Sequence, residues 1–336
     1  GHAPGLRGDQ ARAYLAAGIT TDHECFTKEE ALDKLAAGCK ISIREGSAAR
    51  NFDALYTLLG EHPEMTMLCS DDKHPDELLI GHINLLVRRA VDRGVDKFDA
   101  LQAACLNPID HYGLDVGRLR VGDPADFIEV DSLEQFDVRR TWIDGRLVAE
   151  AGKSLLDRVE PTVVNQFEPA HVAPDQLVVP ESGGRKLQVI EALDGQLITK
   201  GLRVEPLVES KQVVSDVERD LLKMVVVNRY RAAPPAMAFV KNFGLKTGAM
   251  ASSVAHDSHN VIAVGVTDDD LAAAINAVMD VGGGLSAVSH RDGDRWVLPL
   301  PVAGLMATGS CQEVGHAYQE LDAAVKAWGS QLRAPY

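Results

Sequence analysis

The sequence has no excess of basic side chains, no long apolar run and no basic-then-apolar start of the signal-peptide kind. Its 336 residues include 34 lysines and arginines against 49 aspartates and glutamates, a formal net charge of −15 at pH 7. Such a chain has no electrostatic attraction to the phosphate backbone of nucleic acid or to an anionic membrane. No apolar run approaches the roughly 18 residues that a membrane helix needs. The expected partners are therefore neither nucleic acid nor membrane.

Cysteine is sparse as well. The five cysteines are odd in number, scattered, and contain no CxxC pair. This argues for reduced, mostly buried thiols rather than a disulfide framework, so we expect a cytoplasmic protein. The chain also lacks an initiator methionine, and Gly1 leaves no room for a strand ahead of His2. We therefore expect that the sequence is part of a longer one.

Three segments of different character follow one another along the chain. Residues 1–112 alternate short apolar strands with amphipathic helices, and the strands end near residues 21, 44 and 69. This βα repeat of about 24 residues predicts a parallel sheet. Residues 113–160 are β-rich with several glycines, and Asp144-Gly145 predicts a hairpin turn there. A poorly periodic linker at 160–184 leads to an α+β pattern at 185–336.

Several helix boundaries are predicted from local signals. Thr27 with Glu30 three residues later is typical of a capping box, which predicts a helix over 28–37. A long helix is expected over about 76–93, and another over 97–106 that ends at Asn107-Pro108. An apolar stripe predicts a further helix over 269–280.

Two histidines and an aspartate follow the ends of the predicted strands, or head the chain where a strand would have ended. These are His2, His23 and Asp71, and Asp72 directly follows Asp71. Neutral imidazoles and a carboxylate at one sheet edge are what a divalent metal ion requires. Any one of these residues alone is better interpreted as a helix cap or a solvated side chain. Three in register favour a metal site.

Two further polar segments leave alternatives open. The segment 44–51 brings Arg44, Glu45 and Ser47 together after a strand, which suits a substrate pocket. Taken alone, the segment is more safely interpreted as a solvated loop in which Ser47 or Asn51 caps the next helix. In the segment 252–260, His256 and His259 flank an aspartate and a serine. They would contact a metal or substrate, or form a polar turn before the next strand.

These motifs together resemble the bacterial adenine deaminases of the amidohydrolase superfamily. The resemblance extends over nearly the whole chain, and the last segments separate this family from other amidohydrolases. The matching stretches are GHAPG at 1–5, TDHE at 21–24, REGSAARN at 44–51, DDKHP at 71–75, GHI at 81–83, NP at 107–108, the β unit at 117–126, VAHDSHN at 254–260, GGGL at 282–285 and LPVAGLM at 300–306.

The resemblance implies a fold and a division of the chain. Residues 1–112 would be the second half of a (β/α)8 metal-dependent hydrolase barrel, in the α/β class. Residues 113–160 would be a small composite β unit, and 185–336 a family-specific α+β domain. The family's H-x-H pair and a further carboxylate have no counterpart in this sequence. We therefore expect that the chain alone neither folds well nor acts on substrate.

The resemblance also implies an activity, namely adenine + water → hypoxanthine + ammonia in purine salvage, by a homo-oligomer. His2, His23 and Asp71 would bind a divalent ion, Mn²⁺ before Fe²⁺ or Zn²⁺, and Asp71 would also be the catalytic proton shuttle. Two alternatives stay open: another amidohydrolase, such as a cyclic amidase or dihydroorotase-like enzyme, and a non-catalytic remnant. The predicted substrate-binding residues are Arg44, Glu45, Ser47, Asp72, His256 and His259.

Overall fold

The computed structural model describes all residues except 48, 169–170, 185 and 197. The chain divides into two compact units, unit 1 at Gly1–Val159 and unit 2 at Glu160–Tyr336. The molecule belongs to the mixed α/β class, with several separate sheets. Among the described residues, no helix has both the length and the apolar character needed to cross a membrane.

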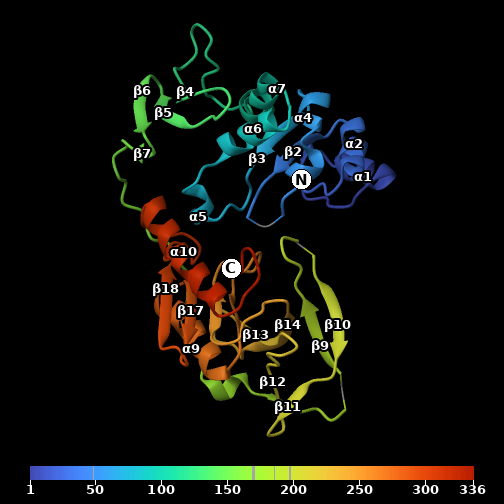
Figure 1. Ribbon diagram of the computed structural model, residues 1–336, viewed down its shortest axis with the longest axis vertical. Coiled ribbons are helices and arrows are strands. Elements are labelled where there is room, and N and C mark those ends of the chain that lie inside the picture. Colours follow the sequence, from blue (N-terminus) through green and yellow to red (C-terminus); the bar gives the residue numbers. More distant parts are fainter. Residues whose placement is uncertain (48, 169–170, 185, 197) are drawn as a thin grey trace. The chain divides into compact units, whose positions relative to one another are not determined.

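A three-stranded parallel sheet with the order β1-β2-β3 forms the centre of unit 1 (Figure 1). Its strands are β1 (Thr21–Asp22), β2 (Lys40–Arg44) and β3 (Thr66–Cys69). Since the strands are parallel, the loops after all three leave from the same edge. The helices of this unit are α1 (Gly8–Leu15), α2 (Lys28–Ala36), α3 (Phe52–Leu55), α4 (Leu58–Glu61), α5 (Pro75–Leu78), α6 (Ile83–Asp92), α7 (Lys97–Leu101) and α8 (Asn107–Tyr112).

The hydrophobic core of unit 1 lies where these helices cover the sheet. Ile41 and Ile43 of β2 pack with Phe52, Leu55 and other apolar side chains that have no exposed surface. Burial of each such side chain stabilises the fold by ~1.5–3 kcal/mol. The core therefore fixes β2, and with it the loop that β2 carries at its carboxyl end.

The predicted helix starts are confirmed, but one capping detail differs. Thr27 accepts a hydrogen bond from the Glu30 backbone N–H at 3.2 Å, as expected of an N-cap. The Glu30 carboxylate accepts from the N–H groups of Phe26 and Gly5 instead of closing a capping box on Thr27. The reason is a long-range contact with the loop at the start of the chain.

Two predicted helices of unit 1 have different bounds. The helix expected over 76–93 is divided into α5 and α6. The helix expected to end at Asn107-Pro108 instead continues through a π-helical turn (Gln102–Leu106) into α8. Proline is tolerated there because it lies in the first turn of α8, where its missing N–H is not needed. Asn107 also donates to the backbone oxygens of Pro63 and Thr66 at 2.6 and 2.7 Å, which ties this turn to β3.

Unit 1 ends in a four-stranded antiparallel sheet with the order β4-β5-β6-β7. The predicted turn at Asp144-Gly145 connects two of its strands, and both residues have positive φ, as a tight hairpin requires. The strands are β4 (Phe127–Val130), β5 (Val138–Ile143), β6 (Arg146–Glu150) and β7 (Lys153–Ser154).

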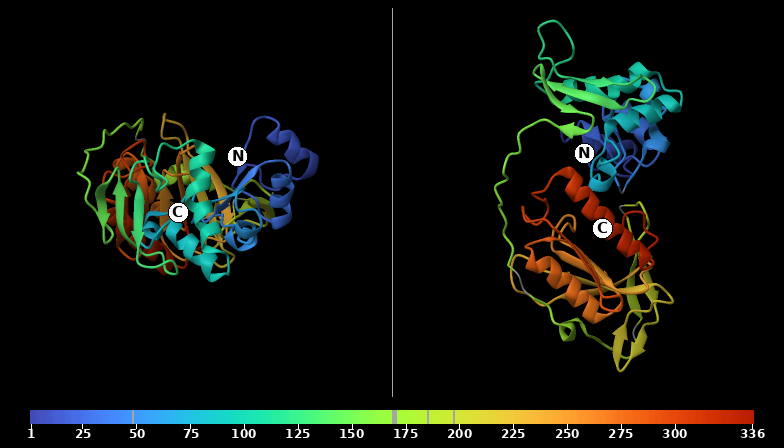
Figure 2. Two further views of the ribbon diagram at one scale, coloured as in Figure 1. Left: turned by 90° about the horizontal axis from the view of Figure 1, so that it is seen from above. Right: turned by 60° about the vertical axis from the view of Figure 1, so that its left-hand side comes forward.

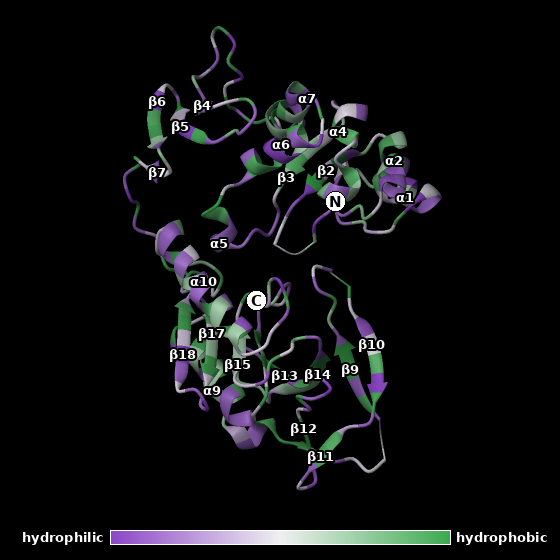
Figure 3. Ribbon diagram, in the orientation of Figure 1, coloured by the Kyte–Doolittle hydropathy of each residue, from purple (hydrophilic) through white to green (hydrophobic). Residues whose placement is uncertain are grey.

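Unit 2 is built on an eight-stranded sheet, with helices α9 (Asp268–Asp280) and α10 (Cys311–Ala327) on its two faces (Figure 2). Ala263 packs against the α9 side and the next residue, Val264, packs on the α10 side, because neighbouring strand residues point to opposite faces. The hydropathy of the central strands agrees with a sheet covered on both faces (Figure 3). In spatial order, the strands are β10 (Lys200–Val204), β9 (Leu187–Glu191), β14 (Ala236–Lys241), β13 (Leu221–Val227), β16 (Val261–Gly265), β15 (Ala249–Ser252), β17 (Gly284–Ser289) and β18 (Asp294–Pro299).

A smaller three-stranded sheet completes unit 2, with the order β11-β12-β8. Its first two strands are β11 (Leu207–Glu209) and β12 (Gln212–Val214), and β8 (Val179–Pro180) comes from the segment expected to be a linker. That segment is therefore partly structured: besides β8 it contains a 3₁₀ helix (Pro174–Leu177) whose Leu177 is fully buried.

Candidate metal centre

The carboxyl edge of the unit 1 sheet gathers the polar residues that the sequence analysis singled out. His23 follows β1, Arg44 is the last residue of β2, and Asp71 lies two residues beyond β3. His2 comes from the loop ahead of α1, and its backbone N–H donates to the Tyr14 hydroxyl at 3.1 Å. The parallel sheet thus brings together side chains from the carboxyl ends of its three strands, and the loop ahead of α1 adds His2.

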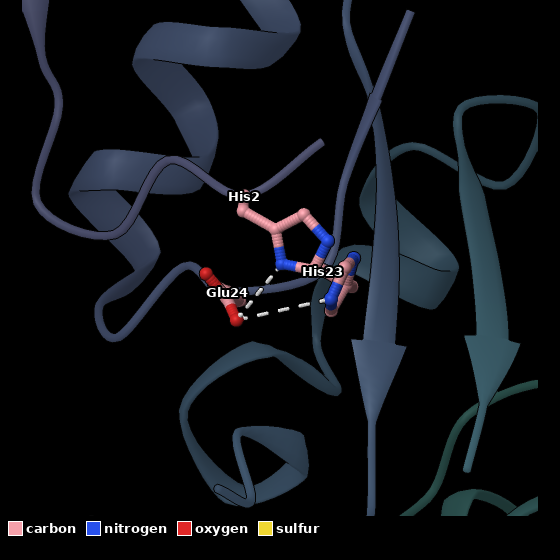
Figure 4. A group of neighbouring side chains, drawn as sticks. All are labelled: His2, His23 and Glu24. Atoms are coloured by element: carbon pink, nitrogen blue, oxygen red, sulfur yellow. Dashed lines mark hydrogen bonds and ion pairs between the residues drawn. The ribbon is translucent and has the colours of Figure 1, made fainter. Parts of the chain in front are cut away.

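The two histidines share a carboxylate that the predicted set of metal ligands did not include (Figure 4). Glu24 Oε1 lies 3.3 Å from His2 Nδ1 and 3.9 Å from His23 Nε2. The imidazole rings meet edge to face with centroids 4.6 Å apart. One ligand atom from each of these three residues lies within 4.8 Å of the other two, so the three side chains form a candidate site for a cation.

Asp71 extends this cluster from the other side. Its Oδ2 lies 3.3 Å from His23 Nε2 and 2.6 Å from Nη1 of Arg44. Arg44 Nη1 is also 3.4 Å from Glu24 Oε1, and its side chain is only 5% exposed. Asp71 has a φ of +52°, a conformation that is strained for a residue other than glycine and often occurs at functional sites.

The electrostatics of His23 fit a bound divalent cation. Burial lowers the pKa of its imidazole, and His2 and Arg44 act in the same direction, whereas Asp71 and Glu24 oppose them. The ring is therefore neutral at pH 7, as a metal ligand must be. Its Nε2 is buried and makes no hydrogen bond with any residue that the structure describes, although two carboxylate oxygens lie within 4 Å. A cation at this point would bind the His23 nitrogen and the carboxylates of Glu24 and Asp71.

The predicted pocket residues around Ser47 bond to helices α5 and α6 and to the loop after β3. Ser47 Oγ donates to Glu77 at 2.8 Å and accepts from the His74 N–H at the same distance. Glu45 pairs with Arg89 at 2.9 Å, and the backbone oxygen of Asp72 accepts from the Ser47 N–H at 2.9 Å. Residue 48 of this loop lies outside the described residues.

Asn51 does not cap the next helix, which was one interpretation of segment 44–51. Its side chain accepts from the Arg44 N–H at 2.7 Å and donates to the backbone oxygens of His23 and Cys25 at 3.2 and 3.1 Å. No side-chain cap bond joins it to α3. Asn51 therefore links the loop of His23 to the end of β2.

His256 and His259 belong to unit 2, in the loop between β15 and β16. Their rings meet edge to face with centroids 5.5 Å apart, and His256 contacts the carboxylate of Asp257. The His256 side chain is 70% exposed. Their predicted contact with substrate stays a prediction.

Comparisons with known proteins show what the chain is similar to. Residues 2–148 match the amidohydrolase family, and residues 196–336 match the adenine deaminase C-terminal domain. An adenine deaminase of Salinibacter ruber is 54% identical over 100% of this chain and 61% of its own length. One from Methanosarcina acetivorans is 48% identical over 100% of this chain and 62% of its own length. The chain is thus similar to adenine deaminases over its whole length and to the amidohydrolase family over residues 2–148.

These matches confirm the resemblance to adenine deaminases of the amidohydrolase superfamily. The chain spans about three fifths of the length of these curated relatives. The match to the amidohydrolase family implies a divalent metal ion. The adenine deaminase matches do not favour the cyclic amidase or dihydroorotase-like alternative.

Glu24 is the residue of the cluster whose part the sequence analysis missed. It directly follows His23 and therefore also lies at a strand end. Adjacent strand residues normally point to opposite sides, which made it a weak candidate beside His23. In the loop after β1 the backbone leaves the extended form, and both side chains reach the same region.

Proposed function

We propose that this chain takes part in the hydrolytic deamination of adenine to hypoxanthine and ammonia. One observation carries the proposal: His2, His23 and Asp71 meet at one sheet edge, in a chain whose relatives at up to 54% identity are adenine deaminases. The buried, unpartnered Nε2 of His23 supports a cation at that point.

The metal centre would be held by the imidazole nitrogens of His2 and His23 and by the Asp71 carboxylate, with Glu24 adjoining. Mn²⁺ is the proposed ion, and Fe²⁺ or Zn²⁺ would suit the same nitrogen and oxygen ligands. A divalent ion there lowers the pKa of water and so makes hydroxide available at neutral pH.

The side chains of the chain itself supply the proton transfers. As the C6–O bond forms, Asp71 takes a proton from the attacking water and passes it to a ring nitrogen. Asp71 then takes the proton of the new C6 hydroxyl and passes it to the amine, so that the C6–N bond breaks, ammonia leaves and C6 becomes the carbonyl carbon of hypoxanthine. Arg44, 2.6 Å from Asp71 Oδ2, holds the carboxylate in one orientation for this transfer.

The proposal extends to architecture and context. Residues 1–112 are proposed to be the second half of an amidohydrolase barrel, followed by the β unit at 113–160 and the C-terminal domain at 185–336. The match of residues 2–148 to the amidohydrolase family and the parallel β1-β2-β3 sheet support this. We propose that the protein acts in purine salvage in the cytoplasm, as a homo-oligomer. The proposed purine contacts remain Arg44, Glu45, Ser47, Asp72, His256 and His259.

A chimera tests the proposed reaction in a protein as long as the curated relatives. The matched region of the Salinibacter ruber adenine deaminase is replaced by this chain, and products from adenine and dihydroorotate are measured after loading with Mn²⁺. Hypoxanthine and equimolar ammonia are expected from adenine alone, with loss of turnover in EDTA. A folded, metal-loaded chimera that hydrolyses dihydroorotate but not adenine would refute the substrate assignment.

A further inference from the structure

A buried ionic cluster lies next to the metal centre in unit 1. The ammonium of Lys34, on α2, is 1% exposed and donates to Glu30 Oε1 at 2.7 Å and to the backbone oxygen of Ala3 at 2.6 Å. It also pairs with the carboxylate of Asp22, which is fully buried. One ammonium thus pairs with two buried carboxylates and binds the loop that carries His2.

The two carboxylates of this cluster continue into the loops of the metal centre. Asp22 accepts from the Glu24 N–H at 3.0 Å. Glu30 accepts from the Gly5 N–H at 2.7 Å and from the Phe26 N–H at 3.0 Å. The network therefore joins residues 3–5, next to His2, with residues 22–26, which include His23.

The cluster is not itself a second metal site. Cys25 lies with Asp22 and Glu30 within 4.8 Å, but the Lys34 ammonium already lies among them, 3.7 Å from the Cys25 sulfur. Burial and the Asp22 charge raise the pKa of the Cys25 thiol far above its ordinary range, so the sulfur is protonated. A metal requires the thiolate.

We propose that Lys34 is a positioning residue of the metal centre: its ammonium joins the His2 loop to the His23 loop and so sets metal affinity without touching the ion. This rests on the proposed metal centre. Removing the ammonium leaves two buried carboxylates without a counter-charge, and their repulsion separates the loops they hold. Groups that orient metal ligands in this way typically change affinity by about 10–100-fold.

The test compares Lys34→Met with Leu58→Ala. Leu58 belongs to the apolar core of unit 1 and has 0% exposure. Its side chain is apolar and so takes no part in the Lys34 ionic network. Mn²⁺ affinity is measured from the spin-resonance signal of free Mn²⁺, and folding from circular dichroism. We expect Lys34→Met to raise the Kd at least about tenfold, and Leu58→Ala to lower the melting temperature while the Kd stays within about twofold.

A second readout follows the loops directly. The Gly5 and Glu24 amide protons, which donate to Glu30 and Asp22, should exchange with solvent faster in Lys34→Met and not in Leu58→Ala. Should Lys34→Met fail to fold, Glu30→Gln, which keeps size but removes charge, carries the test with a smaller rise in Kd.

The outcomes separate the positioning role from the metal centre. A folded Lys34→Met that binds Mn²⁺ as tightly as the unaltered chain overturns the positioning role alone. If the unaltered chain binds no Mn²⁺, the proposed metal centre fails. Unchanged amide exchange in Lys34→Met would show that Lys34 does not join the His2 loop to the His23 loop.

Discussion

Nη1 of Arg44 lies 2.6 Å from Oδ2 of Asp71, which joins the end of β2 to the loop after β3. The sequence placed these two residues in different roles, one on the substrate and one on the metal. In the structure they form an ion pair, with Glu24 as a second acceptor for the same guanidinium nitrogen. Arg44 therefore acts on the carboxylates of the proposed centre, both by orienting Asp71 and by opposing a second cation.

Replacing Arg44 with methionine should separate these two effects. Loss of the guanidinium removes a positive charge next to two carboxylates, so Mn²⁺ should bind more tightly, by about threefold to tenfold. Adenine turnover should nevertheless fall about 10–100-fold because Asp71 loses its orientation. Arg44→Lys, which keeps the charge, is the matched control for the binding measurement. Weaker Mn²⁺ binding in Arg44→Met would show that Arg44 builds the site rather than competing with the ion.

Asp71→Asn should remove the proton transfer. In the chimera, kcat for adenine should fall by about 10²–10⁴, the usual contribution of a general acid–base group. Steady-state kinetics measure this, with Asp115→Asn, an exposed aspartate of unit 1, as the control. Unchanged turnover in Asp71→Asn would favour a different proton carrier and would weaken the assigned role of this residue.

Glu77 should make unit 1 sensitive to acid. Burial alone would raise the pKa of its carboxyl, but the hydrogen bond from Ser47 and the charges of Arg50 and Lys73 outweigh burial and lower it below the ordinary 4.5. The folded state then binds fewer protons than the unfolded state, so this stability is present above pH 4.5 and is lost as the pH falls through the folded-state pKa.

Glu77→Gln checks this dependence. The difference in unfolding free energy between pH 6 and pH 3.5, from chemical denaturation, should be smaller in the variant than in the unaltered chain. Glu64→Gln, at an exposed position of the same unit, serves as the control. An equal pH dependence in both variants would contradict the assignment to Glu77.

Ser253 should stabilise unit 2. It is fully buried, accepts from the Gly284 N–H at 2.8 Å and donates to the Gly304 backbone oxygen at 2.5 Å. Ser253→Ala leaves both backbone groups without this partner, so we expect a loss of ~1–3 kcal/mol in the free energy of unfolding. Ser258→Ala, at an exposed position, should change it by less than ~0.5 kcal/mol. Equal effects in both variants would show that the buried bonds contribute little.

Local patterns were enough to predict the βα repeat, the Thr27 cap and the Asp144-Gly145 turn, because each depends on residues that are neighbours in the sequence. Local patterns failed where contacts between residues distant in the sequence determine a helix end or a strand pairing. The helical segment continues past its expected end into α8, where Asn107 bonds to Pro63 ahead of β3 and to Thr66 at the start of β3. Strands β14 and β15 were not predicted at all; they pair with partners that only the assembled sheet provides.

The candidate site, too, could be predicted from the sequence only in part. That side chains at strand ends converge follows from the geometry of parallel strands, and His23 and Asp71 do lie 3.3 Å apart. Which partner each side chain selects does not follow, so Glu24, the Arg44 ion pair and the Lys34 network emerged only in three dimensions. Their roles in binding and catalysis remain predictions.

Equilibrium binding of Mn²⁺ to the chain, measured by spin resonance, tests the proposed metal centre most directly. The centre predicts saturable binding that His23→Asn abolishes or weakens by at least about 100-fold. His316→Asn, an exposed histidine on α10, should leave the binding unchanged. Saturable binding that survives His23→Asn at full affinity, or no saturable binding in the unaltered chain, would contradict the account.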